Sequence, residues 1–217
     1  MDVLLLLVVL LFSVVVHEVA HALVAKWEGD DTAYRLGRIT LNPIPHLDLV
    51  GSIIVPLLLY FLPGQFIFGW AKPVPVNPAR YRDRKWGDIR VSLAGITANL
   101  LLAVLSLAAL LALLQAASFT GSLGGVLPLL QQGALYGIFL NLILAFFNLL
   151  PLPPLDGSHV LYHLLPPTWG ARYREVGKYG IGIVMLLVFF FPGGFRILLW
   201  PVEFLMVQVD RLVSLWI

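Results

Sequence analysis

A long stretch without a charged residue limits what this chain can fold into. No Asp, Glu, Lys or Arg occurs between Arg90 and Asp156. Because about 20 apolar residues cross a bilayer, this stretch is long enough for two crossings, with the small and polar residues of 117–132 between them. Over the whole chain 12% of residues are charged, against about 25% in a typical soluble domain. The sequence therefore predicts a membrane protein.

Four apolar segments are predicted to form spanning helices, near residues 3–27, 88–116, 133–165 and 179–200. The C-terminal segment 201–217 mixes charged and apolar residues, which fits either a short final span or an amphipathic helix at the membrane surface. We expect one all-α polytopic domain over 1–217, with about four to six transmembrane helices.

Basic residues indicate the orientation of these helices. Most of the 14 Lys and Arg residues lie within 26–90, and a second group lies within 166–178. Cytoplasmic loops are enriched in Lys and Arg, which places both segments in the cytoplasm and 117–132 outside. A net charge of +2 gives no indication of nucleic-acid binding, and the absence of cysteine excludes disulfides and Cys-ligated metal.

The region between the first two spans is irregular. Residues 49–70 are apolar, but prolines interrupt them and basic residues flank them, so a re-entrant or surface-lying segment is expected. Tyr34–Leu41 and Ala71–Val76 have strand character, which predicts a small β region here.

In the second of these strands, Pro73 and Pro75 leave one edge without backbone donors, while Lys72, Val74 and Val76 keep theirs on the other edge. This pattern is typical of an edge strand, although prolines at alternate positions also suit polyproline II.

The first predicted helix contains the sequence His17-Glu18-Val19-Ala20-His21. This spacing puts two imidazoles one turn apart on one face, which suits two zinc ligands, and the glutamate between them can act as general base. Ionisable groups are costly inside an apolar span, so they are functional by default. The alternative is a His/Glu cluster that only pairs with neighbouring helices.

A catalytic zinc needs a third protein ligand and one open position. The candidates are Asp156, His159, His163, His46 and Asp48. Asp156 follows three prolines that break an apolar helix, which suggests a site, but Asp is also a favoured helix N-cap. His159 and His163 lie on the same helix face as Asp156. Histidines at such positions are more often buried or interfacial polar side chains than metal ligands. His46 and Asp48 lie in a Pro-rich turn.

Taken together, these motifs resemble those of the site-2 proteases, a family of intramembrane zinc metalloproteases. Residues His17–His21 match the His-Glu-x-x-His helix, and Leu155–Gly157 match the Leu-Asp-Gly motif with its upstream prolines and Asn148. Residues Ala94–Asn99 resemble the small-residue motif that ends in Asn, with Ile96 where many members have proline.

The resemblance implies one Zn²⁺ per chain, held by His17, His21 and Asp156, with Glu18 as the catalytic base. It also implies cleavage of peptide bonds within or near transmembrane segments, in regulated intramembrane proteolysis. The partners would be a transmembrane protein substrate and the lipid bilayer, with no nucleic acid and an undefined oligomeric state. The sequence leaves no room for the PDZ or CBS domains of some members, so a minimal form is expected.

Substrate contacts are expected at two places. Lys72, Val74 and Val76 would hold an extended substrate by strand addition. Asn99 and Asn148 would hydrogen-bond the substrate backbone or the developing oxyanion. Gly95 and Ala98 are better explained by close packing of helices.

Two other functions fit less well. Another class of membrane zinc protease would take its third ligand from a later Glu, but neither Glu175 nor Glu203 lies in an apolar helical motif. A metal transporter would spread ionisable residues over several spans, whereas here they concentrate at one site. The intact Glu18 argues against a degenerate, non-enzymatic scaffold. Glu18 precedes Lys26 by about 12 Å of helix, which places the active site nearer the cytoplasmic face of an expected plasma-membrane protein.

Overall fold

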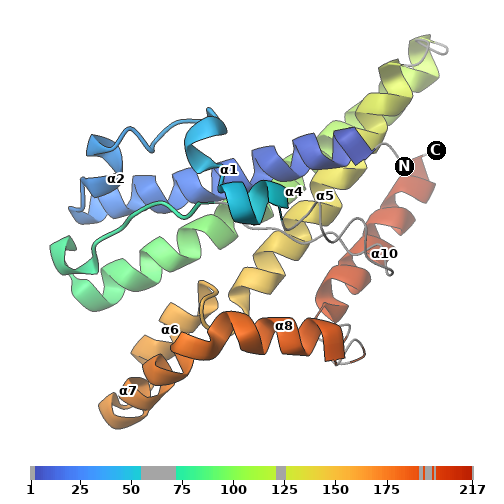
Figure 1. The fold of residues 1–217 in the computed structure, drawn as a ribbon. Helices are drawn as coiled ribbons and strands as arrows, with labels where there is room; N and C mark the ends of the chain where they lie inside the picture. Colours follow the sequence, from blue (N-terminus) through green and yellow to red (C-terminus); the bar gives the residue numbers. More distant parts are fainter. Residues whose placement is uncertain are drawn as a thin grey trace.

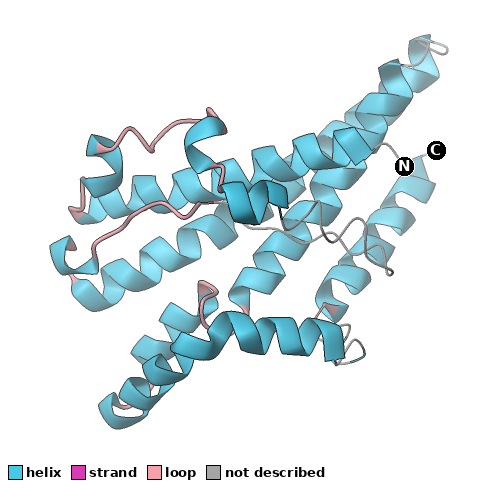
Figure 2. Ribbon diagram, viewed as in Figure 1, coloured by secondary structure: helices cyan, strands magenta, loops and turns pink. Residues whose placement is uncertain are grey.

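The computed structural model describes residues 3–54, 72–120, 126–190, 193, 197 and 199–216. These residues form helices, turns and irregular segments, and no strand occurs among them (Figures 1 and 2). The predicted all-α membrane fold is confirmed. The elements are α1 (Val3–Glu28), α2 (Thr32–Arg35), η1 (Ile44–His46), η2 (Leu49–Ile54), η3 (Pro78–Arg80), α4 (Arg84–Thr120), α5 (Val126–Leu149), α6 (Gly157–Leu164), α7 (Pro167–Val176), η4 (Gly177–Tyr179), α8 (Gly180–Phe190) and α10 (Trp200–Trp216).

Helices α1, α4 and α5 are long and apolar enough to cross a membrane. They pack against one another, with α4 in contact with both of the others (Figure 1). Many of their apolar side chains, among them Leu4, Leu101 and Val126, are exposed outside these contacts, as expected where lipid rather than water surrounds the helices. The close approach of α4 and α5 depends on Gly137, because a Cβ there would collide with the Ser106 side chain.

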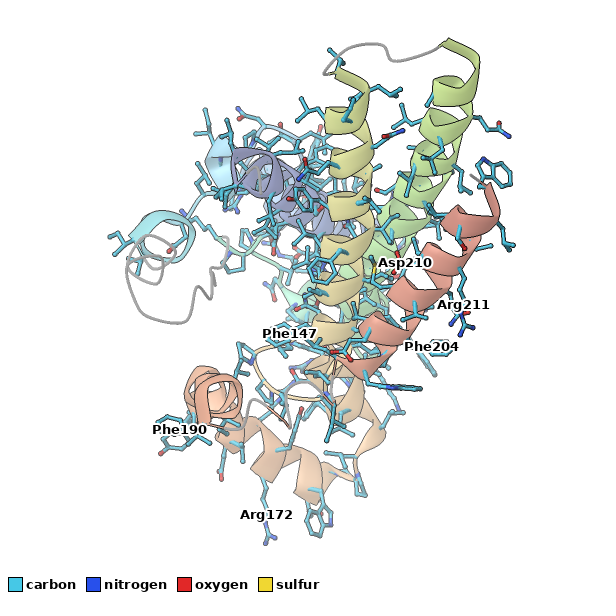
Figure 3. All side chains as sticks on the ribbon, turned by 90° about the vertical axis from the view of Figure 1, so that its right-hand side faces the viewer. Phe147, Arg172, Phe190, Phe204, Asp210 and Arg211 are labelled. Carbon is cyan, nitrogen blue, oxygen red and sulfur yellow. The ribbon has the colours of Figure 1, made fainter. Side chains whose placement is uncertain are left out.

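Helix α10 completes the apolar core beside α4 and α5. Val202 and Val209 of α10 are buried together with Ala103, Ile138 and residues near them. Figure 3 shows α10 running alongside α5, with the Arg211 side chain directed away from the bundle. Helix α10 has 17 residues and is not among the three described helices that are long and apolar enough to cross a membrane.

The cytoplasmic ends predicted for α1 and α4 are tied together. Arg90 donates to Glu28 through Nε at 2.6 Å and through Nη2 at 2.9 Å. The N–H of Arg82 donates to the Glu28 carbonyl at 2.7 Å. Helix α1 ends at Glu28 and is followed by Gly29, whose φ of 111° is accessible mainly to glycine. These contacts set the register between α1 and α4, and both helices contribute to the site described below.

The structure corrects two of the predicted boundaries. The span predicted over 133–165 is wrong, because α5 already ends at Leu149 and the prolines of 151–154 separate it from α6. The loop predicted over 117–132 is also too long, since α4 continues to Thr120 and α5 begins at Val126. Of the span predicted near 179–200, α8 covers Gly180–Phe190.

The strand expected over Tyr34–Leu41 is wrong. Residues Thr32–Arg35 form helix α2, in which the Arg35 N–H donates to the Asp31 carbonyl at 2.9 Å, and turns follow. Lys72–Val76 belong to no helix or strand. Within the expected re-entrant segment 49–70, residues 49–54 form the π-helical element η2, and the remainder lies outside the described residues, as does Ala71.

Candidate metal centre

The two histidines of the predicted motif lie on the side of α1 that faces α4. Their rings meet edge to face with centroids 4.6 Å apart, and the two Nε2 atoms are 3.0 Å apart. His17 is buried and His21 is partly buried. The helical spacing of His17 and His21 therefore brings two potential ligand atoms to one point, as expected.

Asp156 joins this pair from the other end of the sequence. Its Oδ2 lies 3.2 Å from Nε2 of His17 and 3.3 Å from Nε2 of His21. Asp156 occupies the N-cap position of α6, but its side chain makes no capping hydrogen bond. The same Oδ2 atom is buried and has no partner with hydrogen-bond geometry. The carboxylate is thus directed at the imidazoles and away from the helix that it precedes.

The spacing of these three atoms fits a tetrahedral metal ion. Ligands about 2.0 Å from zinc in a tetrahedron stand about 3.3 Å from one another, close to the three distances observed. Two imidazoles and a carboxylate are also a donor set that zinc accepts, with a fourth position open. Among the described residues, His17, His21 and Asp156 form the one group of three such ligands close enough to share an ion.

Two glycines allow the ligands to approach. A Cβ on Gly95 of α4 would lie 2.5 Å from Cε1 of His17 and 2.5 Å from Nε2 of His21. A Cβ on Gly157 would collide with the backbone carbonyl of Leu149 at the end of α5. Gly95 therefore does more than the helix packing that its sequence context favoured, since the space it leaves is the space the imidazoles occupy.

The second nitrogen of each imidazole has its own partner. Nδ1 of His21 lies 2.7 Å from the Val91 carbonyl, and Nδ1 of His17 lies 2.6 Å from Oδ1 of Asn99. Both contacts come from α4 and leave the Nε2 atoms facing Asp156. Asn99, expected to contact substrate, is fully buried and lies against His17.

Glu18 lies next to the metal ligands and contacts the irregular segment before η3. Its Oε2 accepts a hydrogen bond from the Val74 N–H at 2.7 Å. The Lys72 N–H donates to the His46 carbonyl at 2.8 Å, and Val76 is exposed. Two of the three backbone donors expected on a free edge are therefore already engaged. Asn148 donates from Nδ2 to the Leu144 carbonyl of its own helix at 2.9 Å.

The other histidines lie outside this centre. His46 is buried, with Nε2 3.0 Å from the Thr40 carbonyl. His159 and His163 both face Asp88 of α4, with nitrogen-to-Oδ2 distances of 3.3 and 2.7 Å. The hydrogen bond to Asp88 raises the pKa of His159 above its usual value.

Asp88 was not among the residues predicted from the sequence. It is 5% exposed and ties α6, the helix that begins after Asp156, to α4. The sequence could have indicated this role, because Asp88 is an acid at the start of a predicted span. A buried acid there needs a polar partner.

Comparisons with known proteins identify the family of this chain. Residues 129–191 match the model of a family described as peptidase family M50. The chain is 42% identical over 196 residues to "Putative zinc metalloprotease YwhC" of Bacillus subtilis (strain 168), covering 90% of this chain and 84% of YwhC. It is 31% identical over 182 residues to "Putative zinc metalloprotease Rip2" of Mycolicibacterium smegmatis, covering 82% of this chain and 64% of Rip2. No solved structure gives a significant match.

The fold and the comparisons together define a membrane metallopeptidase. The chain belongs to peptidase family M50, the site-2 protease family. The family membership predicted from the sequence motifs is thereby confirmed.

Proposed function

We propose that this protein is an intramembrane zinc endopeptidase that hydrolyses peptide bonds within or near transmembrane segments of membrane proteins. The observation that carries the proposal is the convergence of His17, His21 and Asp156 on one point, with Glu18 beside them. The motif lies within α1, one of three helices long enough to span a bilayer, so a substrate peptide bond would be cut at membrane depth. Membership of the metallopeptidase family supports the same chemistry.

His17, His21 and Asp156 would hold one zinc ion, which supplies Lewis-acid chemistry and lowers the pKa of a bound water toward about 7. Glu18 takes the proton from the attacking water and passes it to the leaving amine. The Val74 N–H holds one oxygen of the Glu18 carboxylate, which leaves the other oxygen for the proton. Asn148 is a candidate donor to the oxyanion, because it lies at the end of α5 just before the Asp156 segment.

The segment Lys72–Val76 is the proposed binding surface for the backbone of an extended substrate. It lies against the motif helix, because Val74 packs with Ala22 and Ala33 and donates to Glu18. A substrate strand that pairs with this segment would take over the N–H groups that now donate to Glu18 and to the His46 carbonyl.

The protein is proposed to lie in the plasma membrane with the site nearer the cytoplasm. The distribution of basic residues supports this orientation, since Lys26, Arg84 and Arg90 all lie at the end of α1 and the start of α4. The site lies between these ends and the middle of the helices. The resemblance to the site-2 proteases makes a single-span membrane protein the proposed substrate class.

The test is the Glu18→Gln variant, which keeps the size of the side chain and removes its ability to accept a proton. Because Glu18 is not among the three ligands, the purified variant should retain one zinc per chain. Cleavage of a membrane substrate in liposomes should fall by at least about 10²-fold, the lower range for general-base catalysis. Glu175→Gln, on an exposed part of α7, is the matched control and should cleave normally. A Glu18→Gln variant with unchanged cleavage would contradict the mechanism.

A further inference from the structure

A chain of buried side-chain hydrogen bonds leads from His17 through all three long helices. Nδ1 of His17 lies 2.6 Å from Oδ1 of Asn99 on α4. Nδ2 of Asn99 donates to Oδ1 of Asn141 on α5 at 3.0 Å, and Nδ2 of Asn141 donates to Oγ of Ser13 on α1 at 2.9 Å. Asn99, Asn141 and Ser13 are 0%, 2% and 1% exposed. A polar group this deeply buried is costly without a partner. Loss of one of these hydrogen bonds would therefore leave a neighbouring buried group unsatisfied.

Two backbone carbonyls determine which group donates and which accepts in each of these hydrogen bonds. The Gly137 carbonyl lies 2.8 Å from Nδ2 of Asn141, and the Val9 carbonyl accepts from Oγ of Ser13 at 2.8 Å. Carbonyls only accept, so Asn141 must turn its NH₂ group toward Gly137. Ser13 has given its one proton to Val9, so its oxygen can only accept from Asn141. The Oδ1 atom of Asn141 must therefore face Asn99.

The same reasoning continues from Asn141 to the metal centre. Because Oδ1 of Asn141 can only accept, Asn99 must present its NH₂ group to Asn141 and its Oδ1 to His17. Nδ1 of His17 must then carry the proton, which leaves a lone pair on Nε2. That Nε2 atom faces Oδ2 of Asp156 and Nε2 of His21. In the opposite tautomer, His17 would direct an N–H at the metal position and could not bind an ion.

We propose that Asn99, Asn141 and Ser13 are positioning residues that hold His17 in the one tautomer able to bind zinc. This inference rests on the proposed function, in which His17 is a zinc ligand. His21 needs no such chain, because its Nδ1 lies directly against the Val91 carbonyl. The proposal gives Asn99 a role toward the metal ligand, and it gives roles to Asn141 and Ser13 that the sequence motifs did not suggest.

Zinc affinity of the metal-free protein, measured by competition with a chelator, tests the proposal without relying on proteolysis. Partners that orient metal ligands typically contribute about 10- to 100-fold to metal affinity, and a loss in this range is expected for Asn99→Leu. Asn141→Leu should lose less, because Asn99 remains but is free to turn over. Ser13→Ala should lose least, because Asn141 keeps its bond to Gly137. The loss of zinc affinity should therefore decrease from Asn99 to Asn141 to Ser13, with increasing distance from His17 along the hydrogen bonds.

Two further variants separate orientation from general stability. Gln132→Leu removes an amide hydrogen bond to the Tyr136 hydroxyl on the same helix as Asn141, but outside the chain, and should bind zinc like the unmodified protein. Asn99→Asp keeps an acceptor facing His17 and should bind zinc more tightly than Asn99→Leu. Equal losses for Gln132→Leu and Asn141→Leu would overturn the proposal.

The tautomer itself can be observed in metal-free protein labelled with ¹⁵N-histidine. The His17 signals, identified by their absence from His17→Gln, should show a protonated Nδ1 and an unprotonated Nε2. Ser13→Ala should keep this tautomer largely unchanged, because the Gly137 carbonyl still orients Asn141. Asn141→Ala, which adds no bulk, should populate the second tautomer measurably even if the leucine variants do not fold. An unchanged tautomer together with unchanged zinc affinity in Asn141→Ala would refute the proposal. Failure of the unmodified protein to bind zinc would instead refute the metal site on which the inference rests.

Discussion

Gly95 of α4 lies so close to His21 of α1 that a Cβ on the glycine would stand 2.5 Å from Nε2 of the imidazole. The contact joins the small-residue segment of α4 to the ligand pair of α1. Sequence alone favours helix packing for a glycine at such a position. The structure shows that the absence of a side chain at residue 95 is what allows the imidazoles to turn toward Asp156.

Gly95→Ala should therefore damage the site rather than the fold. Overpacking a filled interior typically costs about 1–3 kcal/mol, so zinc affinity should fall roughly tenfold or more as the imidazoles are displaced. Gly182→Ala on α8 is the matched control, because a Cβ there meets no atom within 4 Å. Chelator competition on both variants measures the effect. Equal zinc affinity in the two would show that the imidazoles can move aside.

Several features of the site could be predicted from the sequence because they are local. The pairing of His17 with His21 follows from helix periodicity, and three ionisable residues in an apolar span indicate function. Asp156 was ambiguous from its own residues, since an acid before a helix is often a cap. The motif order of the protease family favoured the ligand role, and the structure leaves the cap hydrogen bond unmade.

Other features depend on pairing between distant residues, which periodicity does not report. Ser13 and Asn141 are 128 positions apart, and Asp88 and His163 are 75 positions apart. Each is polar within or beside an apolar segment, which marks it as unusual but does not name its partner. The strand expected over 34–41 failed for a different reason. There, backbone hydrogen bonds between residues four apart close a helical turn at Asp31 and Arg35, and this local closure overrides the alternating pattern.

The orientation in the membrane can be tested with single cysteines, since the natural chain has none. Gln131→Cys, near the start of α5, should be labelled by a membrane-impermeant maleimide added to intact cells. Arg174→Cys, on α7, should be labelled only after the cells are opened. The reverse pattern would place the metal centre near the outer face and invert the proposed topology.

The contact between His159 and Asp88 predicts a dependence of stability on pH. The hydrogen bond to Asp88 raises the pKa of His159, and the charges of Asp88 and Asp156 act in the same direction. Burial of the imidazole and the charge of Arg174 oppose this shift. A raised pKa in the folded protein means that the pair stabilises the fold fully below the ordinary histidine pKa of about 6.5. This contribution disappears as the pH rises through the folded pKa.

Comparison of Tm values measures this effect. The Tm of the unmodified protein should exceed that of His159→Gln more at pH 5.5 than at pH 8.5. The difference should be small, because the His159 side chain is 50% exposed. Asp88→Asn should reduce the pH dependence to the part due to Asp156, since it removes the hydrogen-bonded charge that favours protonated His159. A Tm difference that grows with pH would contradict the assignment.

Zinc-dependent stability distinguishes the two roles that the sequence allowed for Asp156. If Asp156 were mainly an N-cap, Asp156→Ala would cost about 1 kcal/mol whether or not metal was present. The structure predicts otherwise, because the carboxylate makes no capping bond and its buried Oδ2 has no hydrogen-bond partner. Without zinc, the Tm of Asp156→Ala should stay close to that of the unmodified protein. With zinc at about 100 times its Kd, the unmodified protein should gain about 2.7 kcal/mol and the variant much less. Melting curves of both proteins, with chelator and with zinc, provide the four values needed. A variant that is destabilised equally in both conditions would assign Asp156 to the helix cap, and the third ligand would have to be sought elsewhere.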